Sequence, residues 1–391
     1  MTPAARLQTA IELFDAILAG QPTEPVLTRW GRRARYAGSG DRAAVRDLVF
    51  EALRRRRSAA ARGGGGSGRA VLLGLLREAG TDPDSLFTGA RHAPAPLTED
   101  ERAAGRAPEP GAEAGDLPDW LWPRFVVSLG APGAAQTAAA LRDRAPVMLR
   151  VNSRKADIRT AAQSLEQDGI LVHLCDIAPT ALTVTCGARR LRNAAAWRDG
   201  LVELQDGSGQ AAVAALDLPP AGRVLDYCAG GGGKLLAMGA RSDAALVAHD
   251  AAPGRMADLP GRAARAGLEV QRLDTAALPG QAPFDLVLCD LPCSGSGTWR
   301  RTPEAKWRLS PERLTDLGTL QRRILDHAAT LVAPGGRLAC MTCSVLTEEN
   351  AALIDAFIAE RPDWWLEWRR SWPVGPEGDG FGAAQLVWSG Q

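Results

Sequence analysis

Four of the seven cysteines occur in two short segments of the C-terminal half, and two of them could act as nucleophiles. Cys289 and Cys293 lie in CDLPC, and Cys340 and Cys343 lie in CMTC. Residues 340 and 343 of one strand point to opposite faces, which argues against a four-cysteine zinc site. Neither pair opens a helix, as a thioredoxin-type redox pair does. We interpret Cys289 and Cys340 as buried residues, and Cys293 and Cys343 as candidate thiols for covalent chemistry on an electrophilic carbon.

Acidic residues end four successive predicted strands and could bind a cofactor. Strands are predicted at 223–227, 245–250, 269–274, 284–290 and 337–343, with helices at about 234–241, 254–266 and 310–333. This alternation predicts a Rossmann-like α/β fold with a parallel, doubly wound sheet, in which ligands lie beyond the carboxyl ends of the strands. The acids at these ends are Asp226, Asp250, Asp274 and Asp290. Any one of them could be a helix N-cap, but four in succession indicate a ligand crevice.

A glycine-rich loop follows the first of these strands. It consists of Cys228, Ala229, Gly230, Gly231, Gly232, Gly233 and Lys234. Its glycines let the backbone approach a ligand closely, at the start of a helix that favours negative charge. Leu235 stands where a phosphate-binding loop requires Ser or Thr and where a dinucleotide fingerprint requires Gly, so neither ATP nor NAD is favoured. At the next strand end, Asp250 could accept hydrogen bonds from a ribose, and Asp274 could flank a base.

Composition limits the class of protein. The chain has 391 residues, 46% of them hydrophobic and 23% charged, which is typical of a globular protein and excludes extended disorder. No run of 18 apolar residues occurs, and Glu12 and Asp15 interrupt the apolar N-terminal stretch, so we predict neither a membrane span nor a signal peptide. Cysteines concentrated in two motifs, rather than spread as loop cross-links, favour the reducing cytoplasm.

Basic residues gather near the N-terminus. Apolar residues at helical spacing predict an all-helical first region. Between residues 29 and 62 lie eleven arginines and three acids, a local charge of +8 against +1 for the whole chain. Such a cluster is typical of a surface that contacts phosphates, although an arginine-rich chain with only three lysines could equally present a solvated helix face. We expect RNA contacts from Arg54, Arg55, Arg56 and Arg57, and from Lys306.

Composition shifts divide the rest of the chain. Residues 63–68 (GGGGSG) read as a flexible insert, and 93–116 as a long surface connection. A strand, helix, strand, strand pattern then runs from residue 146 to about 185. We therefore predict three domains: a helical domain at 1–140, a small α/β subdomain at 141–210 and the cofactor-binding domain at 211–391.

Several motifs resemble those of the RNA cytosine-C5 methyltransferases, in particular the Fmu/Sun (RsmB) branch that modifies 16S ribosomal RNA. The most specific are the paired cysteine motifs, Asp290 to Gly297 (DLPCSGSG) and Thr342-Cys343-Ser344 with Glu348-Glu349-Asn350. Further matches are Arg150-Val151-Asn152, Gln205-Asp206, 300–307 (RRTPEAKW) and 378–381 (GDGF). The resemblance runs from about residue 146 to the C-terminus. The N-terminal helices are more weakly similar to the NusB-like RNA-binding domain of that branch, and the middle subdomain to an RRM-like fold.

The resemblance implies a cofactor and a role for each motif residue. The cofactor would be S-adenosylmethionine, with the Cys228 to Lys234 loop around its methionine moiety, Asp250 on the ribose and Asp274 near the adenine. Cys343 would be the nucleophile that adds to cytosine C6, Cys293 would assist release, and Asp290 would stabilise the cytosine ring and lie near the cofactor. The family loop usually reads CAAPGGK and here reads CAGGGGK, so the loop should be less rigid.

Alternatives remain at this point. The RNA could be a tRNA or 23S rRNA in place of 16S rRNA, or the chain could be a non-catalytic RNA-binding or ribosome-assembly factor that keeps the fold. A DNA cytosine methyltransferase would instead use Cys293 as nucleophile, and Thr342-Cys343-Ser344 favours RNA over DNA. We further expect a monomer that binds no metal and no membrane.

Overall fold

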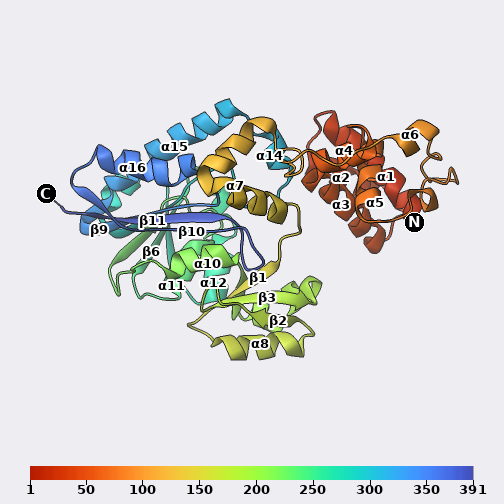
Figure 1. The fold of residues 1–391 in the computed structure, drawn as a ribbon. Helices are drawn as coiled ribbons and strands as arrows, with labels where there is room; N and C mark the ends of the chain where they lie inside the picture. The colour runs from red at the N-terminus through yellow and green to blue at the C-terminus, as the bar shows by residue number, and fades with distance from the viewer. Residues whose placement is uncertain (391) are drawn as a thin grey trace. The chain divides into compact units, whose positions relative to one another are not determined.

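The computed structural model describes residues 1–390, which form two compact units (Figure 1). The helical unit comprises Met1–Arg144 and Trp299–Arg308, and the α/β unit comprises Ala145–Thr298 and the chain from Leu309 onward. The sequence did not reveal that residues 299–308, which follow the first cysteine motif, belong to the helical unit. The three-domain division with boundaries at 140 and 210 stays a prediction.

The helical unit consists of eight α-helices among the described residues, seven from the N-terminal region and one from residues 304–308. They are α1 (Pro3–Leu18), α2 (Thr23–Arg33), α3 (Ser39–Arg54), α4 (Arg56–Gly63), α5 (Gly68–Glu78), α6 (Glu99–Ala103), α7 (Trp122–Leu141) and α14 (Glu304–Arg308). Leu7 and Phe14 of α1 pack with Val45, Val49 and Leu72 in a buried apolar core. The helical character of the N-terminal region is confirmed, and its likeness to NusB stays a prediction.

The glycine run at 63–68 does more than act as a flexible insert. It makes a tight turn between α4 and α5, which contact each other through their backbones. A Cβ atom at Gly63 would lie 1.8 Å from the Ala70 carbonyl oxygen, and one at Gly74 would lie 1.9 Å from that of Ala59. Ser67 caps α5 by accepting a hydrogen bond from the Ala70 amide at 3.2 Å. Glycine is needed here because two helices cross without room for side chains.

A small antiparallel sheet opens the α/β unit. Its strands are β1 (Val147–Val151), β2 (Leu171–Leu174), β3 (Ala181–Cys186) and β4 (Val202–Leu204), in the order β2-β3-β1-β4. Helix α8 (Ile158–Gln167) begins after Asp157, whose side chain accepts a hydrogen bond from the Thr160 amide, and α9 (Ala195–Arg198) follows β3. The predicted strand, helix, strand, strand order is confirmed.

The main sheet has seven strands in the order β10-β11-β9-β8-β5-β6-β7. They are β5 (Arg223–Asp226), β6 (Ala245–His249), β7 (Val270–Leu273), β8 (Phe284–Asp290), β9 (Val332–Thr342), β10 (Trp364–Trp372) and β11 (Phe381–Trp388). Strands β5 to β9 are parallel, as expected. The last two strands, which the sequence analysis did not identify, pair antiparallel at one edge.

Helices cover both faces of the main sheet (Figure 1). One face packs on α10 (Gly207–Ala214), α11 (Gly233–Gly239) and α12 (Leu259–Ala266), and the other on α15 (Pro311–Ala329) and α16 (Ala351–Ala359); the short α13 (Leu278–Gln281) precedes β8. The predicted helix at 254–266 is divided into a 3₁₀ turn, Pro253–Met256, and α12. A proline inside a helix would remove a hydrogen bond, and Pro260 instead stands near the start of α12.

Residues 1–390 contain neither a helix that could span a membrane nor a cluster of metal-binding side chains. Within this part of the chain, no helix combines the length and apolarity needed to span a bilayer. No group of three or more His, Cys, Asp or Glu residues is arranged there to hold a metal ion.

Candidate active site

The two candidate thiols meet where neighbouring parallel strands end. Cys289 of β8 pairs in register with Cys340 of β9, so the segments that leave these strands run side by side. Cys293 and Cys343 lie on those segments, and their sulfur atoms are 3.4 Å apart. Cys289 and Cys340 are buried in the core, as predicted. The sheet thus places the two half-buried thiols in direct contact, although they are 50 residues apart in the chain.

The two thiols differ in acidity. A hydrogen bond from the Cys293 thiol lowers the pKa of Cys343, and this same contact raises the pKa of Cys293. Burial and the Asp290 carboxylate oppose the lowering at Cys343, whereas Lys234 and the Thr298 hydroxyl, 4.0 Å from its sulfur, support it. Cys343 is therefore the more acidic thiol of the pair, and Cys293 the less acidic one. The more acidic thiol is the better candidate for a nucleophile, because the thiolate is the reactive form.

A buried carboxylate joins the two cysteine segments. Glu349, which follows Cys343 in the chain, accepts hydrogen bonds from the Ser294 amide at 2.8 Å and the Ser294 hydroxyl at 2.5 Å. Gln321 of α15 donates to Glu349 at 3.1 Å and to the Pro292 carbonyl at 2.9 Å. Glu349 and Gln321 are both buried. Together they position the Cys293 segment against the Cys343 segment.

Further hydrogen bonds tie the same segments together. The Ser296 and Ser344 hydroxyls are 2.8 Å apart, and the Gly297 amide donates to the Cys343 carbonyl at 3.0 Å. A Cβ atom at Gly297 would lie 2.0 Å from the Gly380 carbonyl oxygen, so only glycine fits. Sequence reasoning recognised Glu349 and these serines and glycines only as parts of motifs. Their motif membership was the available signal, and their positioning role becomes visible only in three dimensions.

A lysine and two carboxylates lie beside the thiols. The Lys234 ammonium is 2.5 Å from an Asp290 carboxylate oxygen and 5.2 Å from the centre of the Phe381 ring. Burial lowers the pKa of Lys234, but Asp290 and Asp226 outweigh it, so the pKa is raised and the lysine stays charged. Burial raises the pKa of Asp226 to about 7, and its Oδ1 atom has no hydrogen-bond partner within residues 1–390. Asp226 thus presents a polar atom available to a ligand.

Asp250 fixes the backbone of the glycine-rich loop through hydrogen bonds. One Asp250 oxygen accepts from the Gly230 amide at 3.0 Å and the other from the Ala252 amide at 2.9 Å, and Arg255 lies 3.2 Å from the first oxygen. Gly232 has φ +78°, a left-handed conformation that favours glycine. A Cβ atom at Gly232 would lie 2.2 Å from Leu259. Gly232 therefore fits at this point of the loop because it has no side chain.

Two further predicted cofactor residues have a different environment. Asp274 is exposed and accepts a hydrogen bond from the Ala277 amide at 2.9 Å, an arrangement typical of a helix cap. Cys228 is half-buried, and burial raises the pKa of its thiol, so it is a neutral neighbour of the loop. Their proposed cofactor contacts stay predictions.

Comparison with known proteins agrees with this arrangement. Residues 213–385 match the model of the family described as 16S rRNA methyltransferase RsmB/F, and 117–188 match a ferredoxin-like domain of RsmF/B-like methyltransferases. The small subunit methyltransferase B of Xanthomonas campestris is 30% identical over 355 residues, covering 83% of this chain and 80% of its own. That of Xylella fastidiosa strain Temecula1 is 33% identical, and the match covers 69% of this chain and 66% of the relative. The chain belongs to the RsmB/F family.

Solved structures show the same fold. The structure of PH0851 superposes with a TM-score of 0.74 at 23% identity and covers 99% of both chains. NSun6 from Pyrococcus horikoshii, solved with SFG, superposes at 0.62 with 15% identity, covering 70% of this chain and 99% of its own. The α/β unit thus has the class I fold of S-adenosylmethionine-dependent methyltransferases. As a member of the RsmB/F family, this chain is an RNA methyltransferase of that class.

The residues of this chain fit the S-adenosylmethionine cofactor of the family. The glycine loop presents no side chains at residues 230–233, and the unpartnered Asp226 Oδ1 at the end of β5 offers an acceptor. Asp250 is buried, yet each of its carboxylate oxygens can accept more than one hydrogen bond, so the ribose remains a suitable partner. When bound, the cofactor supplies an electrophilic methyl group.

Two predicted RNA contacts are wrong in this structure. Lys306 is 1% exposed and donates to the Arg54 carbonyl at 2.9 Å, and burial lowers its pKa to about 7. Arg54 is also buried, with its Nε atom 2.9 Å from the Arg300 carbonyl oxygen. Both side chains lie inside the helical unit, where they satisfy buried carbonyl groups and cannot reach a phosphate.

The other predicted RNA contacts also have partners in the helical unit. Arg55 pairs with Glu51, Glu78 and Asp143 at 2.6, 3.3 and 3.2 Å. Arg57 pairs with Asp119 at 2.7 Å. The Arg56 guanidinium lies over the Trp307 ring, 5.3 Å from its centre. These arginines are part of the packing of the unit, and contact with RNA stays a prediction for them.

Proposed function

We propose that this chain transfers a methyl group from S-adenosylmethionine to C5 of a cytosine in 16S rRNA through a covalent bond between Cys343 and cytosine C6. The asymmetric thiol pair carries the proposal: the sulfur atoms of Cys293 and Cys343 are 3.4 Å apart, and Cys343 is the more acidic. Cytosine C5 is a weak nucleophile, so an enzyme must first add electron density to the ring.

The side chains support a consistent sequence of steps. The Cys343 thiolate adds to C6, and the electron pair of the C5–C6 double bond becomes available at C5 while Asp290 hydrogen-bonds the ring. A cofactor held beside the glycine loop would supply the methyl group that C5 accepts, and its sulfonium sulfur would leave as a neutral thioether. Loss of the C5 proton to water restores the double bond and expels the Cys343 thiolate. Cys293 assists because its thiol donates a hydrogen bond to the departing sulfur.

Methyl transfer to purified 16S rRNA tests the proposal, with cofactor carrying a labelled methyl group. We expect Cys343→Ala to be inactive, and Cys293→Ala to accumulate a covalent adduct with RNA on a denaturing gel. Labelled 5-methylcytosine in the digested product would establish the position. Full activity of Cys343→Ala would overturn the assignment of the nucleophile.

The remaining alternatives give different results in that assay. Transfer to tRNA or 23S rRNA but not 16S rRNA would change the substrate. A chain that binds RNA but shows no S-adenosylmethionine binding by calorimetry would be a non-catalytic factor. A covalent adduct through Cys293 with duplex DNA would indicate a DNA enzyme. A cytoplasmic, monomeric enzyme remains our expectation.

A further inference from the structure

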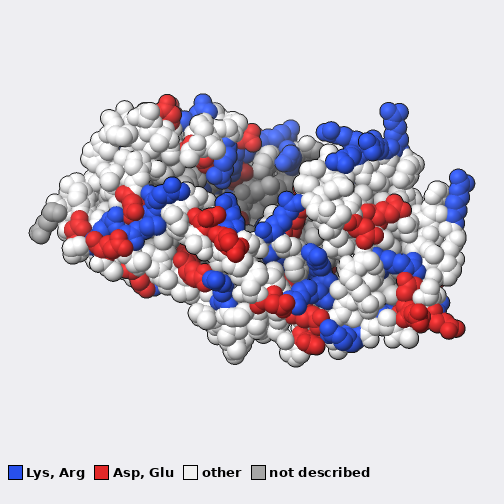
Figure 2. Space-filling view, turned by 90° about the horizontal axis from the view of Figure 1, so that it is seen from above, with Lys and Arg blue, Asp and Glu red and all other residues white. Residues whose placement is uncertain are grey.

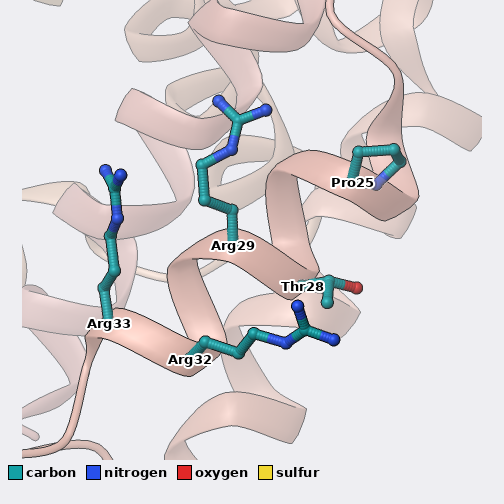
Figure 3. Close-up of a pocket in the computed structure, with 5 residues that line it drawn as sticks. All are labelled: Pro25, Thr28, Arg29, Arg32 and Arg33. Carbon is teal, nitrogen blue, oxygen red and sulfur yellow. The ribbon is translucent and has the colours of Figure 1, made fainter.

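A pocket lined by arginines lies on α2 of the helical unit. Its walls are formed by Pro25, Thr28, Arg29, Arg32 and Arg33, and its volume is about 370 Å³. Figure 3 shows the three arginine side chains on one helix: Arg29 and Arg33 extend to one side, and Arg32 extends in another direction, beside Thr28. All three arginines are exposed. The pocket therefore offers guanidinium groups to a ligand from solvent.

The positive charge of this pocket is not compensated by acids. Among residues 1–390, none of the three arginines is ion-paired, and the contact found for Arg29 is a weak one to the Gln21 side chain at 3.5 Å. The acids closest in the chain or in contact with α2 are already paired. Glu24 pairs with Arg46, and Glu304, which accepts from the Thr23 amide, pairs with Arg308 at 2.8 Å.

An exposed aromatic residue follows the pocket in the chain. Residues 29–36 read RWGRRARY, with four arginines and no acid. Tyr36 ends this segment, and its side chain is 71% exposed, the largest such value for an aromatic residue in the described chain. Figure 2 shows that basic side chains are prominent along the edge of the helical unit on the face in view. Clustered arginines with an exposed aromatic ring are typical of surfaces that bind single-stranded RNA.

We propose that the α2 pocket binds backbone phosphates of the RNA substrate through Arg29, Arg32 and Arg33, and that Tyr36 stacks on an unpaired base. The planar guanidinium presents two parallel N–H groups that match two phosphate oxygens, and the Thr28 hydroxyl can donate a third hydrogen bond. This inference rests on the proposed function for its RNA partner. It adds a site on α2 to the arginines at 55–57, whose contact with RNA stays a prediction.

The test compares two variants of the full chain that lose the same charge. The pocket variant is Arg29→Gln/Arg32→Gln/Arg33→Gln. The control is Arg102→Gln/Arg106→Gln/Arg144→Gln, which removes three exposed arginines that pair with Asp84, Glu113 and Asp47. Affinity for a 16S rRNA transcript is measured by filter binding at several salt concentrations. S-adenosylmethionine binding by calorimetry and thermal melting show that each variant is folded.

We expect the pocket variant to bind RNA about 10- to 100-fold more weakly, with a shallower dependence of affinity on salt, because fewer counterions are released. The RNA KM should rise while kcat at saturating RNA stays unchanged. The control should bind within about twofold of wild type. Arg29→Lys/Arg32→Lys/Arg33→Lys should lose part of the affinity because the fork geometry is lost, and Tyr36→Ala about tenfold.

Other outcomes would overturn the inference. Equal weakening in the pocket and control variants would show that bulk charge acts and not this pocket. Unchanged RNA affinity and KM in the pocket variant would exclude RNA as its occupant and leave an acidic protein surface as the alternative. These two results leave methyl transfer by the wild-type chain intact, so they are distinct from failure of the proposed function, in which the wild type methylates no RNA.

Discussion

The cysteine segments of the α/β unit and the arginine cluster of the helical unit give opposite lessons about prediction. The thiols lie where the sequence placed them, because parallel strands bring their carboxyl ends to one edge of the sheet. The arginines at 54–57, chosen by local charge, are bound to acids, carbonyls and an aromatic ring of the same unit. Strand order determines where a strand end lies, whereas a long arginine side chain takes whichever partner the fold provides.

The comparison also separates two kinds of charge. Near the thiols, Lys234 and Asp290 are half-buried and close together, and their charges act in opposite directions on the pKa of Cys343. On α2, the arginines are exposed and act through solvent, where salt screens them. Four variants, given in order of decreasing expected effect, test this difference between the thiol site and the helical unit.

The largest effect is expected for Lys234→Met. Lys234 pairs with Asp290 and helps to lower the pKa of Cys343, so its removal should make Cys343 less acidic. Methyl transfer in a single turnover should therefore slow by about 10²- to 10³-fold. Lys234→Arg keeps the charge and should retain more activity. A wild-type rate in Lys234→Met would show that the charge of Lys234 does not contribute to methyl transfer.

Glu349→Gln should slow methyl transfer by about 10- to 100-fold. Glutamine keeps one acceptor for the Ser294 amide but replaces the other with a donor, so the Ser294 hydroxyl must accept where it now donates, and both contacts lose the carboxylate charge. Glu348→Gln is the matched control, since it changes an exposed neighbouring carboxylate. The pH dependence of Cys343 alkylation should change only in Glu349→Gln. If both variants behaved alike, Glu349 would have no positioning role.

Cys293→Ala should make Cys343 less acidic. The hydrogen bond from Cys293 lowers the pKa of Cys343, so its loss should move the midpoint of the alkylation profile to higher pH. Below that midpoint, iodoacetamide should modify Cys343 up to about tenfold more slowly, since one pKa unit is a factor of ten in thiolate. Cys293→Ser, which can still donate, should shift the profile less. An unchanged midpoint would contradict the asymmetry of the pair.

The smallest effect concerns the two arginine groups. Arg55→Gln breaks two partly buried ion pairs, with Glu51 and Glu78, and an exposed one with Asp143. It should lower the free energy of unfolding by about 1–2 kcal/mol, measured by urea denaturation. Arg32→Gln on α2 should change it by less than about 0.5 kcal/mol. The reverse order would mean that the segment at 54–57 is the free surface and α2 the structural one.

Much of the fold could be read from the sequence, and the errors have identifiable physical causes. Alternating strands and helices predicted the parallel part of the sheet, because that pattern forces crossover connections. The antiparallel strands β10 and β11 were missed. The tryptophans and arginines of β10 do not give a simple apolar run, whereas β11 is largely apolar and was overlooked. The transfer of residues 299–308 into the helical unit was also hidden, because Trp299 stacks on Phe125, which is far away in the chain.

The sequence alone indicated the residues of the candidate site: two thiols, the acids at strand ends and a glycine loop in a doubly wound sheet. The tertiary structure decided which thiol is acidic, through a 3.4 Å contact, and which carboxylate holds the two segments, through Glu349. It also decided which arginines are structural and which face solvent. The spacing of apolar residues in strands and helices is a local property, so it can be recognised in a sequence. Burial, ion pairing and pKa depend on residues that come into contact only after folding.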